Sequence, residues 1–170
     1  SFLANTAFGG TGADIVVDDL GFYLEPYFED GPIAQAVKSV VANGTIYVSA
    51  AGNDAGVHYE ADYVAGASGF HDFGGGDIAM SVTVSGQGSI DVYLQWNDQF
   101  GASGNDYDLW ICTATCNISN ALQNGDDDPT EVVFFNNTAS SPVSLDIFID
   151  GSFAANTRRL EMFVLGNVTV

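Results

Sequence analysis

The stretch "EDGPIAQAVKSVVANGTIYVSAAGN" (residues 29–53) decides the fold expected for the N-terminal part of the chain, because it predicts a helix followed at once by a strand. Asp30 precedes the helix as a capping candidate, Pro32 suits its first turn, and Asn43-Gly44 supplies a left-handed stop. One buried stripe is predicted from apolar residues at the i, i+3, i+4, i+7, i+8 spacing, namely Ile33, Ala36, Val37, Val40 and Val41.

Apolar runs lie on both sides of this helix. "ADIVVDDLGF" (residues 13–22) contains Ile15-Val16-Val17, a run typical of a strand that is buried on both faces. "TIYVSAAG" (residues 45–52) predicts a second buried strand. Strand, helix and strand within about forty residues predict a right-handed crossover between two parallel strands, the βαβ unit of an α/β fold.

The pattern changes to alternation from Asp77 onward, where helix signals vanish and turns carry Gly, Asn, Asp and Pro. Six strands are predicted, at 77–85, 89–96, 106–112, 130–135, 142–150 and 158–165. They predict an antiparallel β-sandwich or jelly-roll lobe over 77–170, after a Gly-rich linker at 57–76 and the α/β segment at 1–56. The predicted class is therefore α/β plus all-β.

Charge narrows the partners that this chain can have. Among its 170 residues, 22 acidic side chains face only Lys38, Arg158 and Arg159, which gives a formal net charge of -19. Such a surface repels phosphate backbones, which argues against nucleic-acid binding, and attracts cations such as Ca²⁺. No apolar run approaches the length of a membrane span, so none is expected.

Several features favour an extracellular location, either secreted or at the cell surface. Cys112 and Cys116 are spaced for a small disulfide loop; two buried thiols are the alternative, and two ligands alone make a poor zinc site. The chain begins with Ser and shows no signal peptide, so a processed or excised piece is expected. Glycosylation sequons occur at Asn43, Asn117, Asn136 and Asn167.

"GADIVVDDLGFY" (residues 12–23) and "DGPIAQAVKSVVANGTIYVSAAGN" (residues 30–53) resemble the central segment of the subtilisin-like serine proteases, the subtilases. In that family one strand ends in a substrate-pairing stretch, which Asp19-Leu20-Gly21 matches by motif position. The next strand ends in Ala-Ala-Gly-Asn, so the resemblance implies that Asn53 is an oxyanion-hole donor. The alternative is that Asn53-Asp54 only turns the chain after a strand.

The chemistry of such an asparagine is simple, because an amide N–H stabilises the oxyanion of a tetrahedral intermediate without adding charge. Losing one donor of this kind costs about 2.7–4 kcal/mol of transition-state stabilisation, a magnitude measured in subtilisin itself. Small residues at Ala50, Ala51 and Gly52 would let backbone and substrate approach closely.

The catalytic triad of the family is missing from the sequence. The family places an Asp and a His upstream of this segment and a Ser downstream, yet the only histidines, His58 and His71, follow Asn53. Neither a Gly-Thr-Ser-Met stretch nor a Gly-x-Ser-x-Gly elbow occurs. The resemblance therefore implies a fragment of a serine endopeptidase, inactive alone, whose partner is the remainder of the protease polypeptide.

"LQWNDQFGASGNDYDLWI" (residues 94–111) resembles the β-sandwich lobes of the pre-peptidase C-terminal type that accompany secreted proteases. Asp106-Tyr107-Asp108-Leu109 matches their typical Asp-x-Asp-Leu strand. This second resemblance implies a lobe inserted between the oxyanion strand and the nucleophile of the parent enzyme.

Asp98, Asp106 and Asp108 are candidate Ca²⁺ ligands, because oxygen-rich clusters at alternating spacing suit that ion. A solvated acidic turn is the alternative, as it is for the run 126–128. His58 and His71 are expected as surface groups, with metal binding beside nearby carboxylates as the alternative.

Three function classes remain. One is the inactive protease fragment. Another is a non-enzymatic extracellular structural protein, a surface or filament subunit whose copies assemble through strand edges. A calcium- or carbohydrate-binding module is a third possibility, although Trp96 and Trp110 alternate with apolar residues and are expected in the core rather than on a sugar-stacking platform.

Overall fold

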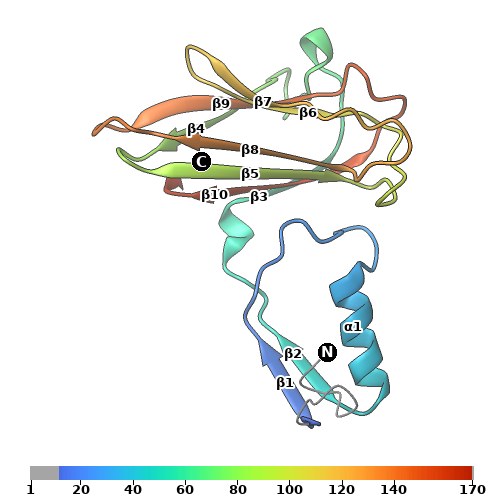
Figure 1. The fold of residues 1–170 in the computed structure, drawn as a ribbon. Helices are drawn as coiled ribbons and strands as arrows, with labels where there is room; N and C mark the ends of the chain where they lie inside the picture. The colour runs from blue at the N-terminus through green and yellow to red at the C-terminus, as the bar shows by residue number, and fades with distance from the viewer. Residues whose placement is uncertain (1–11, 170) are drawn as a thin grey trace. The chain divides into compact units, whose positions relative to one another are not determined.

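The computed structural model describes residues 12–169, and the chain divides into two compact units, Ser1–Ala55 (unit 1) and Gly56–Val170 (unit 2). Unit 1 has one α-helix and a two-stranded sheet, and Figure 1 shows unit 2 as two layers of strands. Both units follow from the change of pattern along the sequence, from a helical period to strand alternation.

Unit 1 contains β1 (Ile15–Asp18), α1 (Pro32–Ala42) and β2 (Ile46–Ser49), followed by the 3₁₀ turn η2 (Asp54–Gly56). β1 and β2 pair in parallel, from Ile15 opposite Ile46 to Asp18 opposite Ser49. The helix and both strands therefore lie where the sequence predicts them.

The start of α1 differs from the expectation. Gly31, not Asp30, is the N-cap, and it offers no side chain to the helix. The Asp30 carboxylate instead pairs with Lys38 on the next turns of the helix. Glu25 takes over the capping role from the preceding loop, since its Oε2 accepts the Ile33 N–H at 3.2 Å.

One face of the two-stranded sheet carries apolar side chains that the described residues leave uncovered. Paired residues in a parallel ladder share a face, and this face carries Ile15 and Val17 of β1 and Ile46 and Val48 of β2. Their exposed fractions are 58%, 71%, 59% and 49%. We call these four residues the open face. The prediction of strands buried on both faces is thus wrong for the described chain, because α1 is the only α-helix in it.

Unit 2 is an antiparallel β-sandwich, as the alternating pattern predicts. One sheet has the order β3 (His58–Asp62), β10 (Arg159–Gly166), β5 (Ser89–Trp96), β8 (Thr130–Asn136). The other has the order β11 (Val168–Thr169), β4 (Met80–Val84), β9 (Val143–Asp150), β6 (Asp108–Cys112), β7 (Cys116–Ser119). The two sheets form the two layers of strands in Figure 1.

The hydrophobic core lies between these two sheets. Every second residue of the central strands points inward, for example Ile90, Val92 and Leu94 of β5, all fully buried. Trp96 continues that row and is also fully buried, with its Nε1 donating to Ser103 Oγ at 3.0 Å. The expected packing role of Trp96 is therefore confirmed.

The segment 57–76 is a structural part of unit 2, not the linker that its glycines predicted. Its first half forms β3, which pairs antiparallel with β10, and η3 (Ala67–Gly69) follows. Tyr63 and His71 from this segment are 8% and 1% exposed. The tyrosines and the histidine bury enough aromatic surface to outweigh a glycine-rich composition.

The structure also locates the cysteine pair and the glycosylation sequons. Cys112 and Cys116 form the expected disulfide, which closes the hairpin between β6 and β7. The four sequon asparagines, Asn43, Asn117, Asn136 and Asn167, are all exposed. None of the described helices is both long and apolar enough to cross a bilayer.

Candidate functional site

The carboxyl ends of β1 and β2 meet at one edge of unit 1. Asp18 and Ser49 form the last ladder pair, and the Ala50 N–H extends the pairing by donating to the Asp18 carbonyl at 3.1 Å. The stretches Asp19-Leu20-Gly21 and Ala50–Asn53 therefore leave the sheet side by side. In open α/β sheets this edge is where ligands bind.

A hydrogen bond ties together the two segments that leave this edge. Tyr23, in the loop after β1, donates its hydroxyl to Asp54 Oδ2 at 2.5 Å. Gly52 has a φ of +76°, a left-handed turn that favours glycine, directly before Asn53. Asn53 is exposed and makes no side-chain hydrogen bond with another described residue. Its amide is thus presented to solvent on a fixed turn.

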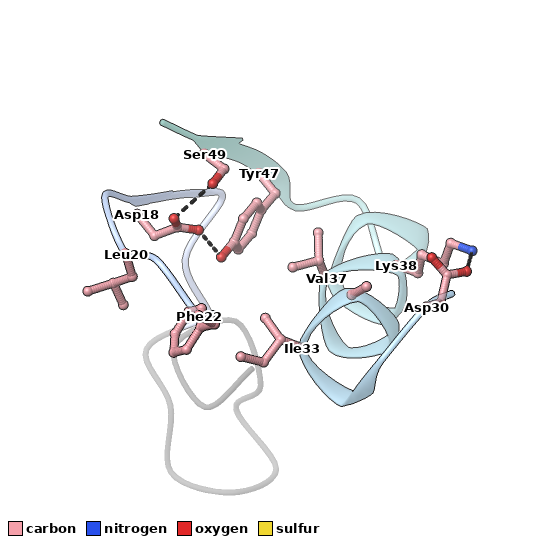
Figure 2. Close-up of a pocket in the computed structure, with 10 residues that line it drawn as sticks. Asp18, Leu20, Phe22, Asp30, Ile33, Val37, Lys38, Tyr47 and Ser49 are labelled. Carbon is pink, nitrogen blue, oxygen red and sulfur yellow. Dashed lines mark hydrogen bonds and ion pairs between the residues drawn. The ribbon is translucent and has the colours of Figure 1, made fainter. Parts of the chain in front are cut away.

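Asp18 lies at the same edge, where two hydroxyls hold its carboxylate. Tyr47 Oη and Ser49 Oγ both donate to it, Ser49 at 2.9 Å, as Figure 2 shows. The Tyr47 hydrogen bond, followed by that of Ser49, lowers the pKa of Asp18. The group therefore stays ionised at neutral pH and is engaged as an acceptor, which does not suit a general base.

A pocket of about 350 Å³ opens beside this carboxylate. Leu20 and Phe22 line it from the loop after β1, and Ile33 and Val37 line it from α1; Figure 2 shows Phe22 on the side of Ile33. Most of its lining is apolar, so the pocket can receive an apolar side chain next to the Asp19-Leu20-Gly21 stretch.

Both histidines belong to unit 2. His71 is fully enclosed, contrary to the expectation of a surface group, because Tyr59, Tyr63 and Phe73 surround its ring. Its Nδ1 accepts the Val64 N–H at 3.1 Å, so the proton resides on Nε2, which donates to Tyr59 Oη at 2.7 Å. Burial lowers the pKa of His71, which makes it a neutral packing residue.

His58 is a member of the one group of described residues whose ligand atoms lie within 4.8 Å of one another, with Glu60 and Glu161. Its Nε2 lies 2.6 Å from Glu161 Oε1. Glu60 is already paired with Arg159 at 2.9 Å. Glu161 therefore has a hydrogen-bond partner and Glu60 an ion partner within the chain, and a cation would compete with Arg159 for Glu60.

Asp98 does not join the other two predicted Ca²⁺ ligands. It accepts hydrogen bonds from Arg158 Nε, from Ser103 Oγ at 3.1 Å and from the Asn105 side chain at 2.7 Å. Burial alone raises the pKa of Asp98, but these bonds from Asn105, Arg158 and Ser103 hold it below its ordinary value. The carboxylate anchors the loop between β5 and β6, which corrects the expectation of a metal ligand.

Asp106 and Asp108 instead lie near two carboxylates from other strands, Glu131 and Asp150. We call these four the end cluster. Asp108 is the ladder partner of Asp150 across β6 and β9, and Glu131 lies at the start of β8. Burial, and then the charges of Asp106, Asp150 and Glu131, raises the pKa of Asp108 to about 6. Burial also raises the pKa of Glu131.

In comparisons with known proteins, no model of a protein family matches the chain, and no curated protein matches it.

Proposed function

We propose that unit 1 is the oxyanion-bearing segment of a subtilisin-like serine endopeptidase, and that unit 2 is an accessory lobe of the same extracellular polypeptide. The chain alone is inactive on this proposal. The observation that carries it is the shared edge, where Asp19-Leu20-Gly21 and the exposed Asn53 leave adjacent parallel strands.

This arrangement fits acyl transfer to a peptide. An extended substrate can add to the Asp19-Leu20-Gly21 stretch as a further strand, with an apolar side chain in the adjoining pocket. On this proposal the Asn53 amide, at the neighbouring strand end, donates to the scissile carbonyl as that group develops negative charge. Unit 1 contains no histidine that could act as the base beside it, because both histidines lie in unit 2.

The open face supports the idea that unit 1 is part of a larger α/β layer. Parallel sheets occur almost only with both faces covered. Here α1 accompanies two strands, and the side chains of Ile15, Val17, Ile46 and Val48 remain about half or more exposed. Additional strands and helices of a parent peptidase would cover them.

The gene on both sides of the encoded segment tests this proposal. We expect an upstream frame with Asp and His motifs and a downstream Gly-Thr-Ser motif. In the full-length enzyme, Asn53→Ala should lower kcat about 10²–10³-fold, as for a lost oxyanion donor. Asn136→Ala, an exposed asparagine of unit 2, is the matched control. A frame that closes without these motifs would contradict the proposal.

The isolated chain gives the complementary measurement. It should neither cleave a generic peptide substrate nor react with a fluorophosphonate probe, whereas a complete subtilisin-like peptidase run in parallel should do both. Turnover by the chain that a serine-directed inhibitor abolishes would contradict inactivity.

The open face also favours one other function, that of a structural subunit. Copies of the chain could bury Ile15, Val17, Ile46 and Val48 against one another in a filament. Sedimentation separates the two functions, since the fragment should stay monomeric at micromolar concentration. Regular assemblies with an interface well over about 1,000 Å² would favour the structural protein.

A further inference from the structure

Three side chains that can bind a metal ion converge on the outer face of the sheet β3-β10-β5-β8. His58 and Glu60 are two residues apart in β3, so they point to the same face, and Glu161 of β10 is the ladder partner of Glu60. This face is turned away from the core, because Leu160 and Met162, on either side of Glu161, are fully buried. The ligand atoms of the three side chains all lie within 4.8 Å of one another. We call His58, Glu60 and Glu161 the edge group, since β3 is the edge strand of its sheet.

The imidazole of His58 is held in place by neighbours on β10. Its ring contacts that of Phe163, its ladder partner, with the ring centroids 5.0 Å apart. Its Nε2 lies 2.6 Å from Glu161 Oε1, and a carboxylate can only accept, so Nε2 carries the proton. The His58 side chain is 31% exposed, which leaves it open to ions from solvent. A metal ion can therefore take the place of this proton, which is released to solvent.

His58 is also the only accessible imidazole of the chain. The sequence contains two histidines, and His71 is 1% exposed. Both ring nitrogens of His71 are engaged, Nδ1 with the Val64 N–H and Nε2 with Tyr59 Oη. A metal ion that requires an imidazole therefore has one place to bind.

Arg159 does not close this site. Glu60 and Glu161 lie directly opposite each other in the ladder, where like charges destabilise a sheet. Arg159 donates to Glu60 Oε1 at 2.9 Å, but its Nη1 also lies 3.5 Å from Asp62 Oδ1. One positive charge is thus shared between two carboxylates, and Glu161 is the third. When an ion takes Glu60, Arg159 keeps Asp62 as its partner.

We propose that His58, Glu60 and Glu161 bind Zn²⁺ through Nε2 and two carboxylate oxygens. Both kinds of ligand bind zinc at about 2.0–2.2 Å, which places neighbouring ligand atoms about 3.3–3.6 Å apart in a tetrahedron. The ligand atoms of the edge group reach that spacing by small side-chain rotations, since they already lie within 4.8 Å. The nitrogen ligand favours a transition metal over Ca²⁺, which prefers oxygen alone. Three protein ligands leave the fourth position to water.

This site is independent of the proposed peptidase function, because it uses residues of unit 2 alone. Among the described strands, β3 pairs only with β10. An ion bound by His58 and Glu60 on one strand and by Glu161 on the other fastens this edge strand to its sheet. Zn²⁺ should therefore stabilise the folded state by mass action.

Isothermal titration of the full chain with Zn²⁺ tests the site, with NMR spectra of the histidine rings and thermal unfolding in parallel. We expect saturable binding that EDTA reverses, and a higher Tm in Zn²⁺ than in EDTA. The ring signals of His58 should shift or broaden when Zn²⁺ is added. Those of the enclosed His71 should not, which makes the second histidine an internal control.

Matched variants assign the binding to the edge group. His58→Gln and Glu161→Gln should each weaken Zn²⁺ binding at least about tenfold, since losing even a residue that only orients a metal ligand costs about that much. Asp91→Asn is the control, because Asp91 is the ladder partner of Leu165 and lies on the same outer face of β5, outside the edge group. It should bind like the wild type. Thermal unfolding in EDTA checks that each variant is folded.

Arg159→Gln tests the role of Glu60. This variant frees Glu60 from its competing partner, so Zn²⁺ binding should tighten several-fold. Lys38→Gln makes the same charge change in unit 1 and should bind like the wild type, which separates the effect on Glu60 from a change in net charge.

Three results would overturn the proposal. One is the absence of saturable heat and of a His58 shift up to millimolar Zn²⁺, which would mean that His58 and Glu161 form a surface hydrogen bond only. Another is undiminished binding by either His58→Gln or Glu161→Gln, which would place the ion elsewhere on the acidic surface. The third is unchanged or weaker binding by Arg159→Gln, which would show that Glu60 is not a ligand.

Discussion

At the residue scale, identical side chains have opposite roles because their partners differ. Asp98 and Asp108 are both carboxylates of the "NDQFGASGNDYD" stretch. Asp98 is surrounded by donors, which lower its pKa, whereas burial and three neighbouring carboxylates raise the pKa of Asp108. Sequence spacing placed both in one candidate site, since it contains no information about Arg158, which is sixty residues away in the chain.

The Asp98 network gives a prediction for stability. Asp98→Ala removes the acceptor of Arg158, Ser103 and Asn105, and the Asp98 side chain is only 7% exposed. Removing one partner of a buried, hydrogen-bonded ion pair leaves the others unsatisfied, so the free energy of unfolding should fall by about 2–4 kcal/mol. Urea unfolding of the full chain measures this change.

Asp126→Asn is the control, because it changes one exposed charge and should leave the urea midpoint nearly unchanged. A loss of less than about 0.5 kcal/mol for Asp98→Ala, the range of ordinary surface substitutions, would mean that Asp98 does not anchor the loop.

At the element scale, the strength of the local pattern determined what could be predicted. The helix at Pro32–Ala42 and the six strands of the sandwich have long, unambiguous periods, and all of them are present. The strands β3, β7 and β11 were missed, since they are short or start in glycine-rich sequence, and their formation depends on pairing with β10, β6 and β4. For β3 and β11 this pairing joins segments far apart in the sequence, which leaves little trace in a local window.

For the candidate sites, too, local patterns could be predicted and long-range strand pairing could not. The shared edge with Asn53 could be predicted, because two parallel strands must end on the same side. The end cluster could be predicted only in part: Asp106 and Asp108 are close in sequence, but Glu131 and Asp150 come from β8 and β9. Register across β6 and β9 brings Asp150 to Asp108, and no local pattern encodes that register.

Gly166, the last residue of β10, provides a test at this scale. Its φ is +122°, and a Cβ there would lie 2.2 Å from the Ser89 carbonyl oxygen. Gly166→Ala should therefore lower the free energy of unfolding by more than about 2 kcal/mol, through backbone strain and the displacement of β5. Gly104→Ala is the matched control, because nothing lies within 4 Å of the added Cβ. Equal urea midpoints for the two variants would contradict the prediction that a side chain at position 166 strains the backbone.

At the scale of the whole molecule, the buried hydrophobic residues are distributed very unequally. Among the described residues of unit 1, only Val16 and Val40 are buried hydrophobic side chains, and its two-stranded sheet has an open face. Unit 2 has a continuous core between two sheets. Because burial of apolar surface is the dominant favourable term in folding, nearly all of the stability of the chain should reside in unit 2.

A truncated chain tests this distribution. Residues 56–170 alone should keep a single cooperative unfolding transition with nearly the Tm of the full chain, since they retain the core and the Asp98 network. Residues 1–55 alone should show no cooperative transition and should bind a dye for exposed apolar surface, because two paired strands and one helix bury too little of it. Loss of cooperative unfolding in the truncated chain would show that unit 2 depends on unit 1. Full stability of residues 1–55 would show that the open face needs no cover, which would remove the support that this face gives to a larger parent domain.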